Sequence, residues 1–361
     1  MNEKIEKLEA IVSDLENKNG YVYFFVFDTK NAPNGEVKYI YDIAKEIQDK
    51  GYNVKMLHQE DEFVGASEWL GDYYDTLEHV DVRKENLAVT PSDYLFIPEV
   101  CTNVMGQVKN LPCRKVMIYY NPTYFNDYMP VGVSLMDYNI HDAITTNSNL
   151  QSKLKSYFPN VNVRIIRPSV RNFFTPNDEP KKLIVNLLTP NSNEVNDIVK
   201  PFYWKYPAYK WISFRDLKGV PQIMLADMLR QAAITVWVDD FTNNGITALE
   251  ALKSGSLLIA KMPNAIPEWM IDNNELLQGV IWVDSYDMLH EVLASVIRGW
   301  TRDDISDEYL NMASKVESVY SIEKQIKDVE RNVEDGIFAE NINVFKQFLS
   351  AEKNKNVNEN E

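Results

Sequence analysis

The feature that most constrains the fold is an alternation of short β-prone runs with amphipathic helical stretches along the chain. The continuous run YVYFFVF at residues 21–27 is typical of a strand that is buried on both faces. A turn-rich loop and a helix over residues 36–50 follow, and a second strand is expected at 54–57. This segment is a βαβ unit, which predicts a right-handed crossover. Further strands of the first half are expected at 94–98, 115–120, 143–146 and 163–166.

The alternation starts again after residue 182. Strands of the second half are expected at 183–188, 209–214, 234–238, 256–260 and 279–283, separated by helical stretches. The chain has 361 residues, and a single hydrophobic core stops growing at about 250–300 residues. The sequence therefore predicts an α/β protein with two Rossmann-like, doubly wound parallel sheets in tandem.

The composition along the chain predicts the boundaries of these parts. A helix with one apolar face opens the chain, and we expect it to pack on the protein, with a small coiled-coil contact as the alternative. Residues rich in Pro, Asn and charge read as a linker between the sheets, and the polar end AEKNKNVNENE reads as disordered. The expected segments are an N-terminal helix (1–20), a first domain (21–168), a linker (169–182), a second domain (183–300), C-terminal helices (301–350) and a tail (351–361).

Charge and cysteine content bear on location and partners. The apolar runs are far shorter than the roughly 20 residues that span a bilayer, and the N-terminus is acidic, unlike a secretory signal. The two cysteines, Cys101 and Cys113, are isolated, which fits a reducing compartment and predicts a cytoplasmic protein without a transmembrane segment. A net charge of −16 disfavours a tight nucleic-acid binder, which needs a basic surface.

The most informative segment is TNNGITALEALKSGSLLIA, at residues 242–260. A loop follows the predicted strand at 234–238, and a helix begins near Gly245. Ligands of doubly wound sheets bind at the carboxyl ends of the strands, where a helix N-terminus attracts phosphate. Gly245 lets the backbone approach a ligand closely, and Glu250 is placed to accept hydrogen bonds from two ribose hydroxyls. The alternative for Glu250 is an exposed helical carboxylate.

This segment resembles the signature of the retaining glycosyltransferases of family 4, which have the GT-B fold. Gly245, Glu250, Ala251 and Gly255 match that signature in register, as does the strand that follows. The resemblance implies two domains facing a cleft, with a nucleotide-sugar donor on the second and the acceptor on the first. It implies transfer with retention, and no metal or cofactor beyond the sugar nucleotide.

The resemblance also assigns residues around the two substrates. Its donor-binding positions fall on Glu250, Gly245, Thr242, Asn243 and Asn244, where Thr242 replaces a glutamate of the family. On the acceptor side they fall on Gly35, in the first βα loop, and on Asn121, which replaces a histidine.

The family's cation for the diphosphate is absent after the first strand of the second domain. Arg215 and Lys218 are substitutes, with solvated loop charges as the alternative. Three acidic residues follow predicted strands, namely Asp239, Asp240 and Glu268. We expect them to line the cleft, with the capping of turns as the alternative. No residue is assigned as catalytic, and His58, His79, His141 and His290 lack the spacing of metal ligands.

The sequence thus predicts an enzyme, a glycosyltransferase that moves a sugar from a nucleotide-sugar donor to an unidentified acceptor. The acceptor stays open among a glycan, a lipid-linked glycan, a protein and a DNA base, and the oligomeric state is also open. Two alternatives remain. One is a DNA-base glycosyltransferase of the phage type, and the other is a non-catalytic GT-B protein used for binding or assembly.

Overall fold

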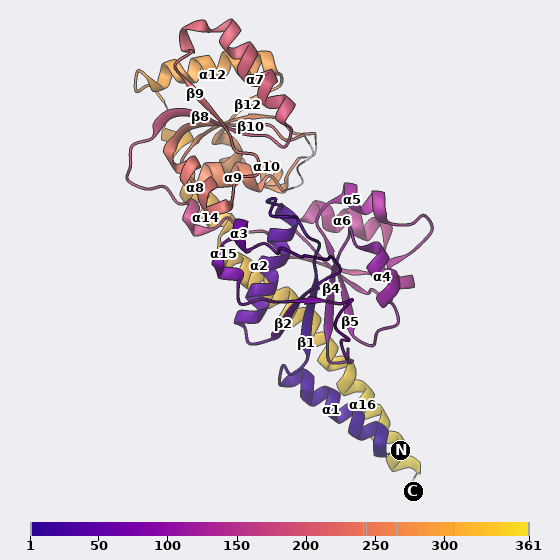
Figure 1. Cartoon of the computed structure of the whole chain (residues 1–361). Coiled ribbons are helices and arrows are strands. Elements are labelled where there is room, and N and C mark those ends of the chain that lie inside the picture. The colour runs from indigo at the N-terminus through magenta and orange to yellow at the C-terminus, as the bar shows by residue number, and fades with distance from the viewer. Residues whose placement is uncertain (1, 241, 243, 265, 306, 360–361) are drawn as a thin grey trace. The chain divides into compact units, whose positions relative to one another are not determined.

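The computed structural model describes residues 2–240, 242, 244–264, 266–305 and 307–359 of the chain (Figure 1). The chain forms two compact units, and each is a parallel sheet covered by helices. The first unit contains residues 1–167 and 325–361, and the second contains residues 168–324. Two parallel sheets and a helical C-terminal segment confirm the fold class expected from the sequence.

The first unit has a seven-stranded sheet in the order β3-β2-β1-β4-β5-β6-β7, with every pair of neighbours parallel. Its strands are β1 (Tyr21–Phe25), β2 (Asn53–His58), β3 (Glu78–Asp81), β4 (Tyr94–Pro98), β5 (Arg114–Tyr119), β6 (Asp142–Thr145) and β7 (Asn162–Ile165). Consecutive side chains of a strand point to opposite faces. In β1, Val22 and Phe24 therefore enter one apolar core, and Tyr23 and Phe25 enter the core on the other face. Burial on both faces explains the uninterrupted apolar run in the sequence.

Helices cover both faces of this sheet. They are α1 (Asn2–Glu16), α2 (Gly35–Asp49), α3 (Ser67–Leu70), α4 (Thr102–Val108), α5 (Pro122–Tyr128), α6 (Ser148–Tyr157) and α16 (Ala339–Glu359), with short turns η1 (Asp72–Tyr74) and η2 (Leu135–Tyr138) and a π-helical segment η5 (Glu330–Phe338). The strand β3 and the short helices lie in segments 59–90 and 121–141, where we expected long connections. Short, mixed-polarity elements of this kind carry too little periodicity to be seen in the sequence.

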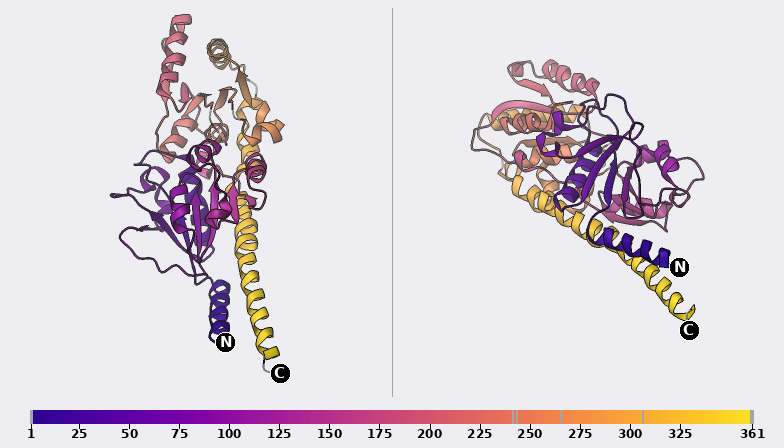
Figure 2. Two further views of the ribbon diagram at one scale, coloured as in Figure 1. Left: turned by 90° about the vertical axis from the view of Figure 1, so that its right-hand side faces the viewer. Right: turned by 60° about the horizontal axis from the view of Figure 1, so that its bottom comes forward.

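The two ends of the chain pair with each other. Helices α1 and α16 run antiparallel, side by side (Figures 1 and 2), with Glu16 bound to Lys346 and Glu9 bound to Lys353, both at 2.6 Å. The helix expected at the N-terminus is present as α1, and it packs on α16. The prediction of a disordered tail is wrong for residues 351–359, because α16 continues to Glu359 and Glu352 pairs with Lys4 at 2.9 Å.

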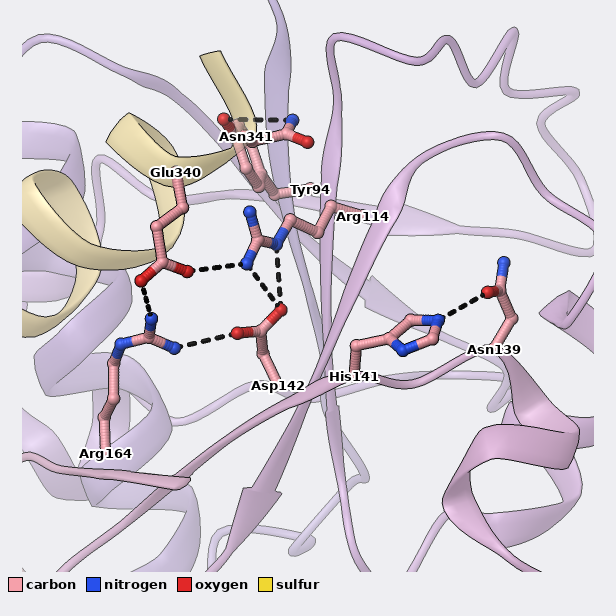
Figure 3. Close-up of polar contacts among 8 residues, drawn as sticks. All are labelled: Tyr94, Arg114, Asn139, His141, Asp142, Arg164, Glu340 and Asn341. Atoms are coloured by element: carbon pink, nitrogen blue, oxygen red, sulfur yellow. Dashed lines mark hydrogen bonds and ion pairs between the residues drawn. The ribbon is translucent and has the colours of Figure 1, made fainter. Parts of the chain in front are cut away.

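An ion-pair cluster attaches α16 to the sheet at the amino ends of its strands (Figure 3). Asp142, at the start of β6, is fully buried and binds Arg114 of β5 and Arg164 of β7, each at 2.8 Å. Both guanidinium groups also bind Glu340 in the first turn of α16, at 3.1 and 2.5 Å. The buried carboxylate is thus neutralised from two sides, as a buried charge requires.

The second unit has a five-stranded parallel sheet in the order β12-β11-β10-β8-β9. Its strands are β8 (Lys182–Leu188), β9 (Ser213–Asp216), β10 (Ala232–Trp237), β11 (Leu257–Lys261) and β12 (Val280–Val283). Its helices are α7 (Ser192–Lys205), α8 (Gln222–Gln231), α9 (Ile246–Lys253), α10 (Glu268–Asp272), α11 (Asn274–Gln278), α12 (Tyr286–Trp300), α13 (Asp307–Leu310), α14 (Ala313–Tyr320) and α15 (Ile322–Val329), with turns η3 (Asn172–Phe174) and η4 (Pro207–Tyr209). From Gln325, within α15, the chain belongs to the first unit again.

Two boundaries differ from the sequence prediction. The strand expected at 209–214 begins at Ser213, because Pro207 starts a helical turn and Tyr209 packs on Phe202 instead. The segment 169–182, expected to be a linker, lies in the second unit, where Phe174 is fully buried in the core.

Helices follow the second sheet, as expected, but the chain from Gln325 onwards, which contains the end of α15, η5 and α16, completes the first unit. Within the described residues, no helix is both long enough and apolar enough to cross a membrane.

Candidate functional site

In each sheet, the strand order reverses at one point, where ligands of doubly wound sheets bind. In the second sheet this point lies between β8 and β10, and in the first between β1 and β4. Every residue that the sequence assigns to the donor was expected at the carboxyl edge of the second sheet. The acceptor residues Gly35 and Asn121 were expected at the same edge of the first sheet.

The loop before α9 is held by its own side chains and by Trp269. Gly245 is the N-cap of α9, in the left-handed backbone region with φ of 59°. Its N–H donates to Thr242 Oγ1 at 2.9 Å, and Trp269 Nε1 donates to the carbonyl of Asn244 at 3.2 Å. A Cβ at Gly245 would lie 2.9 Å from Trp269 Nε1. Glycine is therefore required here by backbone conformation and by packing on Trp269. Asn243, also assigned to the donor, lies outside the described residues.

Glu250 lies on the second turn of α9 and is 1% exposed. Its Oε1 accepts a hydrogen bond from Gln222 Nε2, in the first turn of α8, at 3.2 Å. The alternative of an exposed surface carboxylate is therefore wrong. A carboxylate has two oxygens that accept several hydrogen bonds, so the Gln222 contact is compatible with further hydroxyl donors.

The two cations assigned to the diphosphate lie in different places. Arg215 Nη1 contacts Gln231 Oε1 at 3.5 Å, at the end of α8 that leads into the amino end of β10. The structure therefore does not bring Arg215 to the carboxyl edge. Lys218 is exposed two residues after β9 ends, and so stays near that edge.

A third cation, missed by the sequence analysis, lies at the carboxyl edge beside β10. Lys261, the last residue of β11, binds both carboxylate oxygens of Asp240, at 2.7 and 3.0 Å. Burial raises the pKa of Tyr286 to about 12, and the negative charges of Glu194 and Asp240 add to the rise. Lys261 was detectable in the sequence, because it is the first polar residue after the apolar run SLLIA.

The remaining acidic candidate, Glu268, starts α10 and is 7% exposed.

In the first unit, Gly35 and Asn121 converge on a carboxyl pair that the sequence analysis missed. Glu99 follows β4 and is fully buried, and Glu36 is 2% exposed in the first turn of α2. Glu99 accepts the backbone N–H of Asn121 at 2.5 Å and that of Tyr120 at 3.2 Å. A Cβ at Gly35 would lie 2.9 Å from the Tyr120 hydroxyl. The Asn121 side chain caps α5 by accepting the N–H of Thr123 at 3.0 Å.

The two carboxyl groups hold protons at higher pH than free glutamate does. Burial raises the pKa of Glu36 well above its usual value, and the adjacent Glu99 raises it further. Burial also raises the pKa of Glu99 to about 7, although the N–H donors of Asn121 and Tyr120 lower it. Two buried carboxyl groups in contact keep a proton because both cannot ionise without strong repulsion. A glutamate at the start of a helix is common, so Glu36 did not stand out as a candidate site residue.

Among the described residues, no group of three or more His, Cys, Asp or Glu side chains is arranged to hold a metal ion. His58 and His79 both contact Phe63, with ring centroids 4.1 and 5.3 Å away. His290 contacts the Ile198 carbonyl at 2.9 Å, and His141 contacts Asn139 at 3.0 Å.

Comparisons with known proteins agree on the architecture. No model of a known protein family matches the sequence. The chain is 20% identical over 335 residues to an alpha-1,6-glucosyltransferase of Actinobacillus pleuropneumoniae serotype 7, which covers 89% of this chain and 98% of that protein. Its structure is similar to sucrose-phosphate synthase of Thermosynechococcus elongatus, with a TM-score of 0.59 at 11% identity over 89% of this chain and 99% of the other.

The chain is also similar in structure to the pneumococcal O-GlcNAc transferase GtfA, solved in complex with UDP and GlcNAc. The TM-score is 0.52 at 11% identity, over 69% of this chain and 58% of that chain. The chain has the GT-B fold. With this fold, the carboxyl edges of the two sheets are the places to seek the substrates, as the sequence resemblance implied.

Proposed function

We propose that the protein is a glycosyltransferase that moves a sugar from a nucleotide-sugar donor to a hydroxyl-bearing acceptor. The observation that carries the proposal is Glu250, buried on α9 behind a helix N-terminus at the carboxyl edge of the second sheet. A relative named as a glucosyltransferase, matched over 98% of its length, supports the same activity.

Different residues of the second unit bind the ribose and the diphosphate of the donor. Glu250 accepts hydrogen bonds from the ribose hydroxyls, and Gln222 fixes the orientation of its carboxylate. The Thr242 and Trp269 contacts hold the start of α9, where the helix dipole favours the diphosphate. Lys261 and Lys218 supply positive charge at the same edge. Metal-independent transfer is part of the proposal, and so is the absence of any cofactor beyond the sugar nucleotide.

The reaction breaks the bond between the anomeric carbon and the oxygen of the diphosphate. The diphosphate leaves with the bonding electrons, and the acceptor oxygen forms the new bond to the anomeric carbon. The acceptor's proton ends on the leaving phosphate. Stabilising negative charge on the leaving group is usually among the largest contributions to such catalysis.

The proposal also includes the family, the stereochemical outcome, the donor and the location of the protein. The resemblance of residues 242–260 supports family 4 and transfer with retention. UDP-glucose is the first donor to test, because the relative is named as a glucosyltransferase and GtfA was solved with UDP. The two cysteines, Cys101 and Cys113, are buried and free, which supports a cytoplasmic location.

A thermal-shift screen with UDP, GDP, ADP, CMP, dTDP and their common sugar conjugates tests the donor site. A ligand that binds only the native state raises the melting temperature by mass action. We expect one nucleotide to stabilise the wild type and to lose its effect in Glu250→Gln. Nucleotide released in the presence of a hydroxyl acceptor then measures turnover.

A non-catalytic binding or assembly role is the second candidate. It is favoured by one observation, that the guanidinium of Arg215 contacts Gln231 and leaves the diphosphate without an arginine from β9. A well-folded wild type that binds none of these nucleotides would establish that reading and exclude the transferase.

A further inference from the structure

The first unit contains a cavity that no assigned residue explains. It has a volume of about 570 Å³, within the usual range of small-molecule sites. Its walls come from the carboxyl ends of β2 and β3, from α2 and from residues 59–67. His58 is the last residue of β2 and Asp81 the last of β3, so the cavity lies at the same edge of the sheet as Gly35.

The cavity adjoins the acceptor-side loop. Strand β2 pairs with β1, and neighbouring strands lie about 4.8 Å apart. The loop between β1 and α2 contains Asn31, whose amide donates to Glu68 of α3 at 2.6 Å. Ser67, the preceding residue of α3, lines the cavity. One wall of the cavity is thereby attached to the loop that leads into Gly35, the first residue of α2.

Part of the cavity lining is aromatic. Phe63 stacks on His58 with ring centroids 4.1 Å apart and an interplanar angle of 15°. The Tyr41 hydroxyl contacts His79 Nε2 at 2.6 Å, and the rings of Tyr41 and Tyr74 meet edge to face. His58 is 7% exposed, and its Nδ1 has no hydrogen-bond partner among the residues that the structure describes. A buried imidazole nitrogen of this kind needs a polar ligand atom or water.

The mouth of the cavity is acidic. Its lining carboxylates are Glu60, Glu62, Asp75 and Asp81, and its one lining lysine is Lys84. Asp81 is bound by Lys84 at 3.0 Å and by Arg83 at 2.8 Å, so the excess negative charge comes from the other three carboxylates. Carboxylates only accept hydrogen bonds, so they favour ligands with hydroxyl donors and repel phosphates and carboxylates. Aromatic rings, imidazole nitrogens and several carboxylate acceptors in one cavity together suit an uncharged polyhydroxyl ring.

We propose that this cavity binds a distal sugar unit of an uncharged oligosaccharide acceptor. The proposal rests on the proposed transferase function and narrows its acceptor from four classes to a glycan. A sugar held beside β2 and β3 keeps the rest of the glycan at the carboxyl edge of β1, next to Gly35. The acidic lining also disfavours acceptors that carry a phosphate or carboxylate group on that distal unit.

The test measures sugar binding without any nucleotide. Isothermal titration calorimetry uses the full chain with three neutral trisaccharides, isomaltotriose, maltotriose and N-acetylchitotriose, and with isomaltotriose oxidised to a carboxylate at one C6. We expect at least one neutral trisaccharide to bind and the oxidised one to bind more weakly. Phe63→Ala should raise the Kd of the neutral ligand about tenfold, because it removes the central ring of the wall.

A second variant tests the cavity in case Phe63→Ala does not fold. Glu60→Gln with Glu62→Gln keeps the shape of the mouth and removes two charges, and should narrow the preference for neutral over oxidised trisaccharide by about three- to tenfold. Glu3→Gln with Glu6→Gln, on exposed positions of α1, is the control with the same charge change and should alter neither ligand.

The outcomes separate this proposal from the transferase itself. The cavity proposal is overturned if no neutral trisaccharide binds, if the oxidised ligand binds best, or if binding is the same in both cavity variants. Failure of nucleotides to shift the melting temperature, with trisaccharide binding intact, removes the transferase function and leaves the cavity as a carbohydrate site.

Discussion

Glu340, in the first turn of α16, is bound at 2.5 Å to Arg164 of β7, which lies 176 residues earlier in the sequence (Figure 3). The pair belongs to the cluster around Asp142, and it joins the last helix of the chain to the far end of the first sheet. The two acids of this cluster differ in burial, since Asp142 is fully buried and Glu340 is about half exposed. We therefore expect the two acids to contribute unequally to the free energy of unfolding.

Asp142→Ala should destabilise the protein by about 3–5 kcal/mol, because it leaves two partly buried arginines without their buried partner. Glu340→Ala should cost less than about 1 kcal/mol, because an exposed carboxylate is well solvated in both states. Urea unfolding of the two variants measures the difference. Equal losses of unfolding free energy would mean that Glu340 stabilises the protein as much as the buried Asp142 does.

Glu250→Gln should lower kcat/KM for the nucleotide sugar by about 10- to 100-fold, because hydrogen bonds to a charged acceptor contribute about 1.5–3 kcal/mol. The side chain keeps its shape, so the melting temperature without ligand should change little. Glu275→Gln, at an exposed position of α11, is the matched control. Steady-state kinetics with the donor found in the screen measures the effect, and an unchanged kcat/KM would remove Glu250 from the donor site.

Gly245→Ala should destabilise the second unit more than Gly219→Ala does. Both glycines have positive φ, 59° and 73°, so both substitutions carry the backbone penalty of about 1–2 kcal/mol. A Cβ at Gly219 meets nothing within 4 Å, whereas a Cβ at Gly245 meets Trp269 at 2.9 Å. Thermal or urea unfolding of the pair therefore isolates the packing contribution, and identical losses would show that Trp269 moves aside without penalty.

The Glu36–Glu99 pair should make stability depend on pH between about 4.5 and 7. Both pKa values are raised in the folded protein, so the folded state holds protons that the unfolded chain has released. The contribution is therefore fully present below the unfolded pKa of about 4.3 and is lost as pH rises through about 7. Glu99→Gln mimics the protonated acid and should remove the part of this fall that comes from Glu99, while burial still keeps the pKa of Glu36 raised.

The measurement is urea unfolding of the wild type and of Glu99→Gln from pH 5 to pH 8. The difference between the two curves is the quantity to use, because His290 has a lowered pKa and contributes the opposite trend. A difference that stays constant with pH would contradict the raised pKa of Glu99.

The strands were largely predictable because burial on both faces leaves an unbroken apolar run. Strand β4 was predicted at its observed bounds, and the donor loop was expected where α9 begins. The strand expected at 209–214 begins only at Ser213, because the aromatic and apolar residues among 209–212 do not belong to the sheet. Tyr209 packs on Phe202 of α7 from a helical turn, and a sequence window does not distinguish that packing from a strand.

The parts of the site that depend on long-range contacts could not be predicted. The direction of Arg215 is set by Gln231 of α8, and the pairing of Glu36 with Glu99 is set by the order of β1 and β4 in the sheet. Neither contact leaves a periodic pattern in the sequence. The tail at 351–359 was misjudged for the same reason, since its partner is α1 at the other end of the chain.

The second unit, residues 168–324, is an insertion within the first, whose last helices come only after residue 325. During synthesis, the inserted unit leaves the ribosome whole while the enclosing one still lacks η5 and α16. The cluster of Arg114, Asp142 and Arg164 then lacks Glu340 until α16 has been synthesised. We therefore expect the inserted unit to become protease-resistant first on stalled nascent chains, and the enclosing unit only after α16 has left the ribosome.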